Sequence, residues 1–301
     1  MEILIFGGAG FIGSSLTKKL LAKGHSICLI CRDMSKAEKN IGKHPNLSLR
    51  SINILNEAQL KTTIKEYDCI INLIGRLYET KPGEFEKYHY DFVKKLIKSM
   101  QNEQHLIHIS ALGVEDSRNS SLYAKTKYNA EQAIIKNTEK YNIIKPSIVF
   151  GRQDNFFNMF AKMSSFSPII PLIGGGKTKF SPVYVQDLVD AICVLIEQKN
   201  LNKVYAACGP DTETFKHLMQ YILKILGRKR LLIAIPYSIA RLQAQAMNVV
   251  NIYILTTDQV ELLKHDNINN NNLANINDLI KKLTSYKDIV PSYLKKTNKK
   301  A

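Results

Sequence analysis

Short apolar runs alternate with longer amphipathic segments through the first half of this chain. The longer segments place apolar residues at helical spacing, whereas the runs have the length and composition of buried strands. In chain order the runs include ILIF, SICLIC, CIINLIG, HLIHIS and NIIKPSIVFG. Strands and helices that take turns build a parallel sheet with helices on both faces, because each crossover between parallel strands needs a helix. The sequence therefore predicts an α/β fold with a doubly wound parallel sheet.

The second half of the chain has a looser pattern. After Arg152 comes a stretch broken by Pro and Gly, followed by segments with helical spacing such as ETFKHLMQYILKILG. We expect residues 1–152 to form the sheet domain and residues 153–301 to form a smaller, mostly helical lobe that is interleaved with the sheet. The amphipathic segment at residues 237–255 is expected in the core of that lobe. Its alternative is a contact surface for a partner or a membrane.

The chain carries a formal net charge of +16 over its 301 residues. Its lysines are spread along the whole sequence and end in a cluster of Lys295, Lys296, Lys299 and Lys300. A surplus of this size favours a phosphate-rich cofactor, a nucleic acid or an anionic membrane surface as partner. Because Lys, Ile and Asn are jointly abundant, an AT-rich coding sequence is the plainer explanation. No basic–aromatic motif is present, so no nucleic-acid partner is expected.

Five cysteines, an odd number in a chain of this length, indicate a reducing compartment and no disulfide framework. Cys28 and Cys31 spell C-x-x-C in a strand-like run, where residues three apart point to opposite faces, so no metal or redox pair is expected. His105 and His108 lie in or beside a core strand, without a metal-ligand pattern. No run of about 18 apolar residues predicts a membrane span, and the expected first strand leaves no room for a leader peptide. These features predict a cytoplasmic protein.

A glycine-rich stretch, GGAGFIG, follows the first apolar run directly. Gly7, Gly10 and Gly13 give the pattern G-x-x-G-x-x-G, while Gly8 with the last two gives G-x-G-x-x-G. Glycines at this spacing let the turn tighten, the backbone approach a pyrophosphate and the next helix pack close to the strand. The helix that begins near Phe11 then offers free N–H groups to the phosphates. The loop therefore predicts dinucleotide binding, with a purely structural turn as the alternative.

The residues after the second run distinguish two forms of such a cofactor. An acidic residue at this point holds a free ribose 2′-hydroxyl, but the chain has Cys31 and Arg32 there. A guanidinium pairs with a 2′-phosphate through two hydrogen bonds. Asp33 follows one position later, where its carboxylate would weaken the distinction between a 2′-phosphate and a free 2′-hydroxyl. The sequence therefore favours NADP(H) over NAD(H).

The stretch YAKTK places Tyr123 and Lys127 four residues apart, on one face of an expected helix. An ammonium near a phenol lowers the pKa of the phenol, so the pair can pass a proton to or from a substrate oxygen. Ser110 ends the run HLIHIS at the ligand-binding edge of the sheet, and its hydroxyl can bond to the same oxygen. We expect Ser110, Tyr123 and Lys127 to be the catalytic residues. The alternatives are a Ser110 that caps a turn, a half-buried Tyr123 and a solvated Lys127.

The pattern Y-x-x-x-K is weak by itself, because roughly one or two matches are expected by chance in a chain with 14 Tyr. Tyr90 with Lys94 and Tyr141 with Lys145 also fit the pattern. Only Tyr123 comes soon after a buried run that ends in a polar residue. Its context therefore selects it among the three tyrosines.

Several stretches together resemble a known family. GGAGFIG, YAKTK and KPSIVFG are similar to motifs of the short-chain dehydrogenase/reductase superfamily, in its extended or atypical branch. PSIVFGRQDNFFNMFA, PLIGGGKTKFSPVYVQDLVDAI, LTTDQVELLKHDN and IVPSYLKK resemble the dehydrogenase-like accessory subunit of respiratory complex I (NADH:ubiquinone oxidoreductase) and its bacterial homologues. The resemblance extends from Met1 to about Lys295, and the later stretches are more specific than the glycine loop.

The resemblance implies an NAD(P)-binding Rossmann domain with a small C-terminal lobe and a bound NADP(H). It also implies which positions contact the cofactor. These are Gly7, Gly10, Phe11, Ile12, Gly13, Arg32, Asn53, Ile54, Leu73, Gly75, Tyr123, Lys127 and Pro146. Asn53 stands where relatives often have an Asp near the adenine, so the match to the family is weakest there.

These features together predict an oxidoreductase linked to respiration or quinone metabolism, which passes a hydride between nicotinamide and a carbonyl or alcohol carbon. Two alternatives belong to other classes of protein. One is a non-catalytic, cofactor-stabilised scaffold that docks on a membrane-associated respiratory complex or on the inner face of the membrane itself. The other is a nucleotide-sugar epimerase or dehydratase, whose diphosphate substrate needs basic contacts such as Lys177, Lys179 and Arg228.

Overall fold

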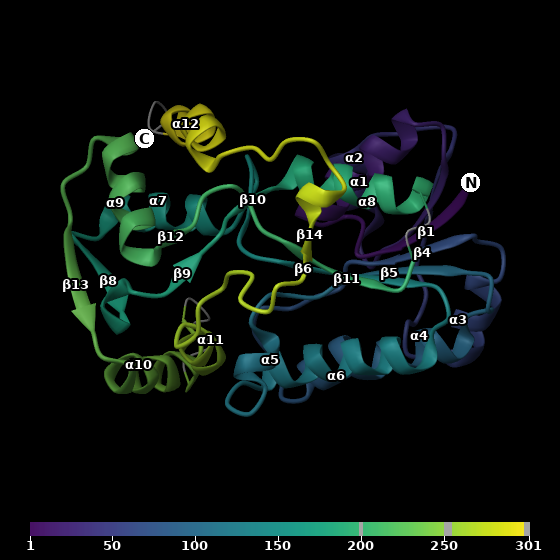
Figure 1. Ribbon diagram of the computed structural model, residues 1–301, viewed down its shortest axis with the longest axis horizontal. Coiled ribbons are helices and arrows are strands. Elements are labelled where there is room, and N and C mark those ends of the chain that lie inside the picture. The colour runs from purple at the N-terminus through teal and green to yellow at the C-terminus, as the bar shows by residue number, and fades with distance from the viewer. Residues whose placement is uncertain (199–200, 250–254, 298–301) are drawn as a thin grey trace.

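An eight-stranded parallel sheet forms the centre of the molecule in a computed structural model that describes residues 1–198, 201–249 and 255–297 (Figure 1). Across the sheet the strands are β14 (Ala274–Asn275), β11 (Lys203–Ala207), β6 (Tyr141–Pro146), β5 (His105–Ile109), β4 (Cys69–Asn72), β1 (Glu2–Phe6), β2 (Ser26–Ile30) and β3 (Leu47–Arg50). Each pair of neighbours runs parallel. The expected fold class is confirmed. The strand order reverses beside β1, which is where ligands bind in such sheets.

Helices cover both faces of this sheet (Figure 1). One face carries α1 (Phe11–Ala22), α2 (Met34–Ile41) and α8 (Val185–Gln198). The other carries α3 (Glu57–Ile64), α4 (Phe92–Ser99) and α6 (Leu122–Asn137). A π-helix, η1 (Glu86–Asp91), runs directly into α4, and the short helix α5 (Val114–Ser117) precedes α6. The central strands are therefore covered on both sides, which explains why their sequences are continuous apolar runs.

Three of these helices begin at a residue that caps them. The side-chain oxygens of Asp33, Asn56 and Ser121 each accept a hydrogen bond from the backbone N–H three positions on, at the starts of α2, α3 and α6. Such caps satisfy N–H groups that have no partner within the helix. The caps fix where α2 and α6 begin, and both helices border the candidate site described below.

The remaining elements form a smaller lobe at one end of the sheet domain (Figure 1). Its helices are α7 (Phe156–Phe166), α9 (Phe215–Leu226), α10 (Tyr237–Val249), α11 (Thr257–Leu262) and α12 (Tyr286–Thr297). Its strands pair as β7 (Val149–Phe150) with β10 (Val183–Tyr184), β8 (Ile169–Ile173) with β13 (Leu231–Ile235), and β9 (Lys179–Phe180) with β12 (Glu213–Thr214). The 3₁₀ helices are η2 (Gly174–Gly176) and η3 (Ile276–Asp278), of which η3 lies beside β11. Aromatic side chains such as Phe157, Phe215 and Tyr286 fill the core of the lobe.

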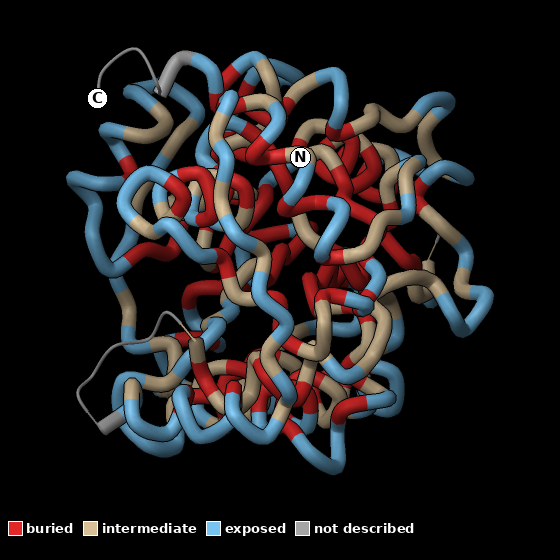
Figure 2. Tube along the Cα trace, turned by 90° about the vertical axis from the view of Figure 1, so that its left-hand side faces the viewer, coloured by how far each residue is buried: buried red, intermediate tan, exposed pale blue. Residues whose placement is uncertain are grey.

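The chain returns to the sheet twice after it enters the lobe. It comes back first for α8 and β11, and a second time for β14, before α12 packs against α7 and α9. Figure 2 shows that the buried segments gather in the interior of the molecule and the exposed ones on its outside. The two parts therefore share several crossings of the chain, and the boundary at residue 152 stays a prediction.

Two expectations extend past the part of the chain that the structure describes. The helix expected over residues 237–255 begins at Tyr237 and is described through Val249, so its last residues lie outside. Lys299 and Lys300 of the terminal cluster and the side chain of Lys296 also lie outside. Within the described ranges, no helix combines the length and the apolar character that a bilayer crossing requires.

Candidate dinucleotide and catalytic site

The loop between β1 and α1 is tight because three of its glycines leave no room for a side chain. Gly7 has a φ of +82°, in the left-handed region that favours glycine, and a Cβ there would lie 3.1 Å from the Leu73 carbonyl carbon. A Cβ on Gly8 would lie 2.4 Å from the Leu29 side chain. One on Gly13 would lie 2.5 Å from the Cα of Gly8. These glycines let the strand, the loop and α1 pack directly against one another.

Gly10 differs from these glycines because its missing Cβ faces open space. Among the described residues, a Cβ there would meet only the Gly7 carbonyl oxygen, at 3.4 Å. Gly10 is also the N-cap of α1, whose first turn has neither a side-chain cap nor an acidic residue. Free N–H groups and the positive end of the helix dipole suit a pyrophosphate. Phe11 and Ile12, which follow, are half-buried against the core. The loop therefore fits a dinucleotide.

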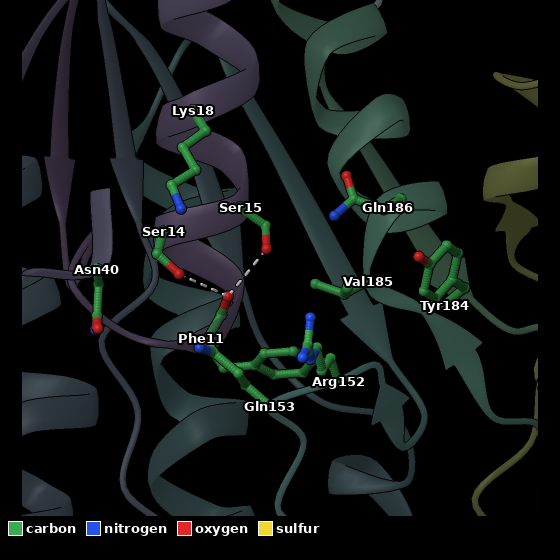
Figure 3. Close-up of a pocket in the computed structure, with 10 residues that line it drawn as sticks. All are labelled: Phe11, Ser14, Ser15, Lys18, Asn40, Arg152, Gln153, Tyr184, Val185 and Gln186. Atoms are coloured by element: carbon green, nitrogen blue, oxygen red, sulfur yellow. Dashed lines mark hydrogen bonds between the residues drawn. The ribbon is translucent and has the colours of Figure 1, made fainter. Parts of the chain in front are cut away.

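A cavity of about 220 Å³ opens beside the first turns of α1 (Figure 3). Ser14, Ser15 and Lys18 of α1 line it, together with Arg152 from the segment after β7. Neither Lys18 nor Arg152 makes an ion pair with another described residue. Two free cations beside a helix N-terminus suit a phosphate. Neither was expected from the sequence, although Arg152 directly follows an apolar run, where ligand-binding residues of such sheets lie.

Arg32 lies just after β2, exposed and without an ion pair among the described residues. Asp33, which could have held a free ribose, has another role. Its Oδ1 accepts a hydrogen bond of 2.9 Å from the backbone N–H of Lys36, so it caps α2. The competing carboxylate is therefore engaged by the helix, while the guanidinium is free.

Five other residues expected at the cofactor lie at the same edge of the sheet as the glycine loop. Asn53 and Ile54 follow β3, Leu73 and Gly75 follow β4, and Pro146 ends β6. Asn53 and Gly75 are exposed, whereas Pro146 is buried. The carboxyl ends of parallel strands meet at one edge, and this explains why residues far apart in sequence gather there. Their contacts with a cofactor stay predictions.

Lys127 is buried at this edge, between the ends of β4 and β5. Its Nζ donates to the Ile109 carbonyl oxygen at 3.0 Å and lies 3.5 Å from the Ile74 carbonyl oxygen. A Cβ on Gly75 would lie 3.5 Å from the same Nζ. Burial lowers the pKa of Lys127 to about 8, although the nearby Glu131 opposes this shift. The alternative of a solvated lysine is wrong.

Tyr123, one helical turn before Lys127, is also buried. Its ring packs edge-to-face against Phe85 and His89. Its hydroxyl makes no hydrogen bond with any other described residue. The expectation that Lys127 lowers the pKa of Tyr123 is wrong: burial, aided by the charge of Glu131, raises this pKa to about 12. The phenol is therefore protonated at neutral pH, and its O–H remains available to a ligand.

His89, on the π-helix η1, holds Tyr123 in place. Its Nε2 accepts a hydrogen bond of 3.0 Å from the backbone N–H of Arg76, and its Nδ1 lies 3.1 Å from the Thr126 hydroxyl. Burial lowers the pKa of His89 to about 2, so the ring is neutral, and the Arg76 bond leaves Nδ1 to carry the proton. His89 carries no signal in the sequence, because its irregular helix and its aromatic neighbours arise from packing. π-helices recur at functional sites.

Ser110 points away from Tyr123. Its hydroxyl donates to the buried carboxylate of Glu131, which also accepts from Lys145 Nζ at 3.1 Å. The next residue, Ala111, packs with Tyr123 instead, because successive residues of an extended chain point in opposite directions. No hydrogen bond in the described part of the chain joins Ser110 to Tyr123. The structure therefore places Tyr123 and Lys127 on the buried face of α6 and bonds the Ser110 hydroxyl to Glu131. The catalytic roles of all three residues stay predictions.

A buried charge cluster continues from Lys127 along α6. Lys145 Nζ pairs with Glu131 and with Glu115, whose side chain reaches the surface. Burial raises the pKa of Glu131 to about 7, against the opposing effect of Lys145. The sequence carried a signal for Glu131, since it follows Lys127 by four residues and therefore shares its helix face. Lys145 had no such signal, because it lies inside an apolar run.

The other candidates of the sequence have structural roles. Tyr141 and Lys145 lie on β6, so their spacing does not place them on one helix face. Arg228 donates to the Ala161 carbonyl oxygen and to the Ser164 hydroxyl, and so holds α7 instead of facing a ligand. The cysteines of the described residues are free and buried. No group of metal-ligating side chains forms within the described ranges.

Comparison with known proteins places the chain among relatives. The family model for the NAD dependent epimerase/dehydratase family matches residues 3–208. NADH dehydrogenase (ubiquinone) 1 alpha subcomplex subunit 9, mitochondrial, of Arabidopsis thaliana is 28% identical over 97% of this chain, which covers 74% of that protein. The mouse protein of the same name is 27% identical over 74% of this chain, and 61% of its own length is covered. The resemblance seen in the motifs is confirmed.

Solved structures share the fold at low identity. UDP-glucuronic acid 4-epimerase from Bacillus cereus, in complex with UDP-glucuronic acid and NAD, has a TM-score of 0.75 at 17% identity, over 99% of this chain and 100% of that chain. A dTDP-glucose 4,6-dehydratase from Bacillus anthracis, in complex with NAD, has a TM-score of 0.65 at 20% identity, over 78% and 84%. The family match spans more than half of this sequence. The chain belongs to the NAD dependent epimerase/dehydratase family.

Proposed function

We propose that this chain binds a nicotinamide dinucleotide, NADP(H) in preference to NAD(H), and acts as an oxidoreductase linked to respiration or quinone metabolism. The observation that carries the proposal is the ammonium of Lys127, buried at the ligand-binding edge of the sheet one turn from Tyr123. Burial of a lysine costs free energy because its charge leaves water. Strongly perturbed groups of this kind gather at functional sites.

Different residues around the glycine loop would contact different parts of the cofactor. Phe11 and Ile12 offer backbone N–H groups to the pyrophosphate, Gly10 leaves space for it, and Arg152 and Lys18 line the adjoining cavity and add charge. Arg32 would hold the 2′-phosphate, and Asn53 with Ile54 would border the adenine. Leu73, Gly75 and Pro146 would border the nicotinamide, and Lys127 and Tyr123 would hold its ribose.

The chemistry of the site follows from two protonation states. When bound, the nicotinamide supplies or accepts a hydride. The Tyr123 hydroxyl, with a pKa raised to about 12, is protonated at neutral pH and donates to a carbonyl oxygen as that oxygen gains negative charge. Lys127, with a pKa lowered to about 8, still carries its charge at neutral pH and stabilises the phenolate left behind. At neutral pH this arrangement holds ready the proton that reduction of a carbonyl or a quinone requires.

Calorimetric titration with NADPH and NADH tests the cofactor preference. We expect Arg32→Ala to weaken NADPH binding by roughly tenfold to 100-fold, the value of charge-assisted hydrogen bonds, and to leave NADH binding unchanged. Arg50→Ala is the matched control, because Arg50 is also an exposed arginine at the end of a strand, β3. Tighter binding of NADH by the wild type would reverse the preference. Absence of binding by either nucleotide would overturn the proposal.

A second candidate function is a cofactor-stabilised docking protein of a membrane-associated respiratory complex. The names of the relatives favour it, because these proteins are mitochondrial NADH dehydrogenase subunits. The nucleotide would then be bound without turnover, and the protein would sit at the periphery of a membrane. Both functions require the glycine loop to bind a nucleotide. A measurement of turnover therefore distinguishes the oxidoreductase from the docking protein.

Turnover is measured as the loss of NADPH fluorescence on addition of quinones, ketones or sugar nucleotides. We expect oxidation with a quinone or a ketone, and a loss of at least about 100-fold in Tyr123→Phe, which removes the proton donor and keeps the ring. Conversion of a sugar nucleotide without net loss of NADPH, followed by chromatography of the sugar, would instead support an epimerase or dehydratase, because these enzymes recycle their cofactor. Nucleotide binding without turnover of any of these compounds would leave the docking function.

A further inference from the structure

The outer end of the lobe exposes an unusual amount of apolar surface. Among the large apolar side chains there, Phe166 is 72% exposed, Leu231 66% and Leu242 68%. Ile169, Ile233 and Ile239 are exposed as well, and we call these six residues the apolar face. Exposed apolar side chains are ordinary when scattered singly, but a group of them on adjoining elements marks an interaction site.

Strand register explains part of the apolar face. β13 pairs with β8 so that Leu231 lies opposite Ile169 and Ile233 opposite Pro171. The alternate residues of β8, Ile170 and Leu172, are buried in the lobe. Side chains alternate along a strand, so the residues between the buried ones point to the opposite face of the strand pair. In β8 and β13 the residues on this opposite face are apolar as well. β13 has no further strand beyond it among the described residues and forms the outer edge of the lobe (Figure 1).

Helix α10, which follows β13 directly, has the reverse of the usual helix pattern. Its small residues Ala240 and Ala244 are fully buried, whereas Ile239 and Leu242 face outward. An amphipathic helix of a lobe normally buries its largest apolar residues. Within the described part of this helix, the expected core position is confirmed for Ala240 and Ala244, whereas Ile239 and Leu242 are exposed.

The stretches of sequence that carry the apolar face contain basic residues and no acidic ones. No Asp or Glu occurs from residue 155 to 186 or from residue 214 to 257. The same stretches contain Lys162, Lys177, Lys179, Lys216, Lys224, Arg228, Lys229, Arg230 and Arg241. Lys162, Lys224 and Lys229 are exposed and make no ion pair with any other described residue. Arg241 lies 3.8 Å from Glu261 and is the cation here with an acidic neighbour.

We infer that the outer end of the lobe docks on an anionic membrane surface, with the apolar face in the lipid interface and Lys162, Lys224 and Lys229 on the headgroups. Apolar side chains fringed by unpaired cations are the composition that binds such interfaces. Phosphate headgroups complement the free cations, and acyl chains accept aliphatic side chains without needing matched hydrogen bonds. The inference rests on the peripheral location proposed above and not on the nucleotide chemistry.

Vesicle flotation of the full chain tests this surface. We expect it to float with vesicles of mixed phosphatidylcholine and phosphatidylglycerol, not with phosphatidylcholine alone, and to be released by salt. Leu231→Ser combined with Leu242→Ser should reduce binding at least tenfold, whereas Ile135→Ser, at an exposed isoleucine of α6, should not. Lys229→Glu should reduce binding by roughly tenfold. Lys136→Glu, at an exposed lysine of α6, should have a far smaller effect.

NADPH thermal shift on every variant distinguishes this inference from the nucleotide proposal. Variants that keep the nucleotide shift but lose flotation support the docking surface. Equal binding to neutral vesicles, or equal loss in the α6 controls, would overturn it. Sedimentation could instead reveal self-association that depends on Leu231 and Leu242, without flotation. This result would show that the apolar face binds a second copy of the chain and would overturn the membrane inference. Flotation without any nucleotide shift would leave the inference standing and remove the nucleotide proposal.

Discussion

Lys127 and Glu131 share the buried face of α6, and Glu131 alters the protonation of Lys127. Burial alone would neutralise both groups, because a low-dielectric interior disfavours either charge. The charge of Glu131 opposes this effect at Lys127, and the pairing with Lys145 opposes it at Glu131. The charge of Lys127 therefore depends on a carboxylate whose own bonds go to Ser110 and Lys145. In the proposed mechanism, Glu131 is a positioning residue for the proton transfer by Tyr123.

Glu131→Gln should lower the pKa of both Lys127 and Tyr123, because the charge of Glu131 raises both. Stability gives a second readout. The folded-state pKa of Glu131, about 7, exceeds its ordinary value of 4.5, so the folded wild type holds an extra proton between these pH values. It therefore loses stability as pH rises through this window. The variant should lack this loss and gain up to roughly 3 kcal/mol relative to the wild type across the window in urea unfolding.

Glu131→Gln also removes the ion pair with Lys145, which changes the stability of the variant at every pH. The prediction therefore concerns the slope of the free energy of unfolding against pH. Glu115→Gln is the control, since it removes the other carboxylate bonded to Lys145 at the surface side of the cluster. Parallel curves for Glu131→Gln and the wild type would contradict the prediction.

At the scale of elements, the glycine loop must both pack tightly within the fold and leave space for a cofactor. Substitution of single glycines can separate these two requirements. Gly13 is required by packing, since a Cβ there would enter the backbone of Gly8 at 2.5 Å. Gly10 has room for a Cβ within the fold and lies where we propose that the pyrophosphate binds. On this proposal, different glycines of one motif serve the fold and the cofactor.

Gly13→Ala should reduce the free energy of unfolding by at least about 2 kcal/mol, because backbone atoms cannot yield as a side chain can. Gly10→Ala should retain wild-type stability within about 1 kcal/mol and bind NADPH at least tenfold more weakly, since the added methyl occupies the approach of the phosphates. Urea unfolding and calorimetry measure both properties on each variant. Unchanged NADPH affinity in Gly10→Ala would contradict the proposed position of the pyrophosphate.

The elements near the glycine loop were predictable because local pattern decides them. Continuous apolar runs and helical spacing locate the strands and helices of the sheet domain, and Tyr123 and Lys127 follow from helix periodicity. The direction of the Ser110 side chain was not predictable, because it depends on the residue at which β5 ends. The roles of His89 and Arg152 depend on contacts with distant segments, which periodicity does not encode. The apolar face requires the pairing of β8 with β13, a contact between strands far apart in sequence.

At the scale of the whole molecule, the last described segment of the chain ties the lobe to the sheet domain. Thr284 donates to Asp187 of α8 from its backbone at 2.6 Å and from its hydroxyl at 3.0 Å. Tyr293 of α12 donates to Asp154, just before α7, at 2.5 Å. Asp154 also accepts from three backbone N–H groups. This segment therefore joins α8 in the sheet domain to the first helix of the lobe.

Tyr293→Phe should lower the free energy of unfolding by about 1.5–3 kcal/mol, the value of a hydrogen bond to a charged group, because the buried Asp154 loses its side-chain donor. Tyr221→Phe is the matched control, since Tyr221 donates from an exposed position to the Lys287 carbonyl oxygen at 3.2 Å. It should cost less than about 1 kcal/mol. Equal losses in urea unfolding would contradict the role given to Asp154.

The repeated return of the chain to its sheet also limits how such a protein can change over time. Because α8, β11 and β14 interrupt the lobe, no continuous piece of the gene encodes it. Recombination cannot exchange it as a cassette between relatives. New binding preferences at the lobe must therefore arise by point substitutions or loop insertions. The lobe and the sheet domain are inherited together as one unit.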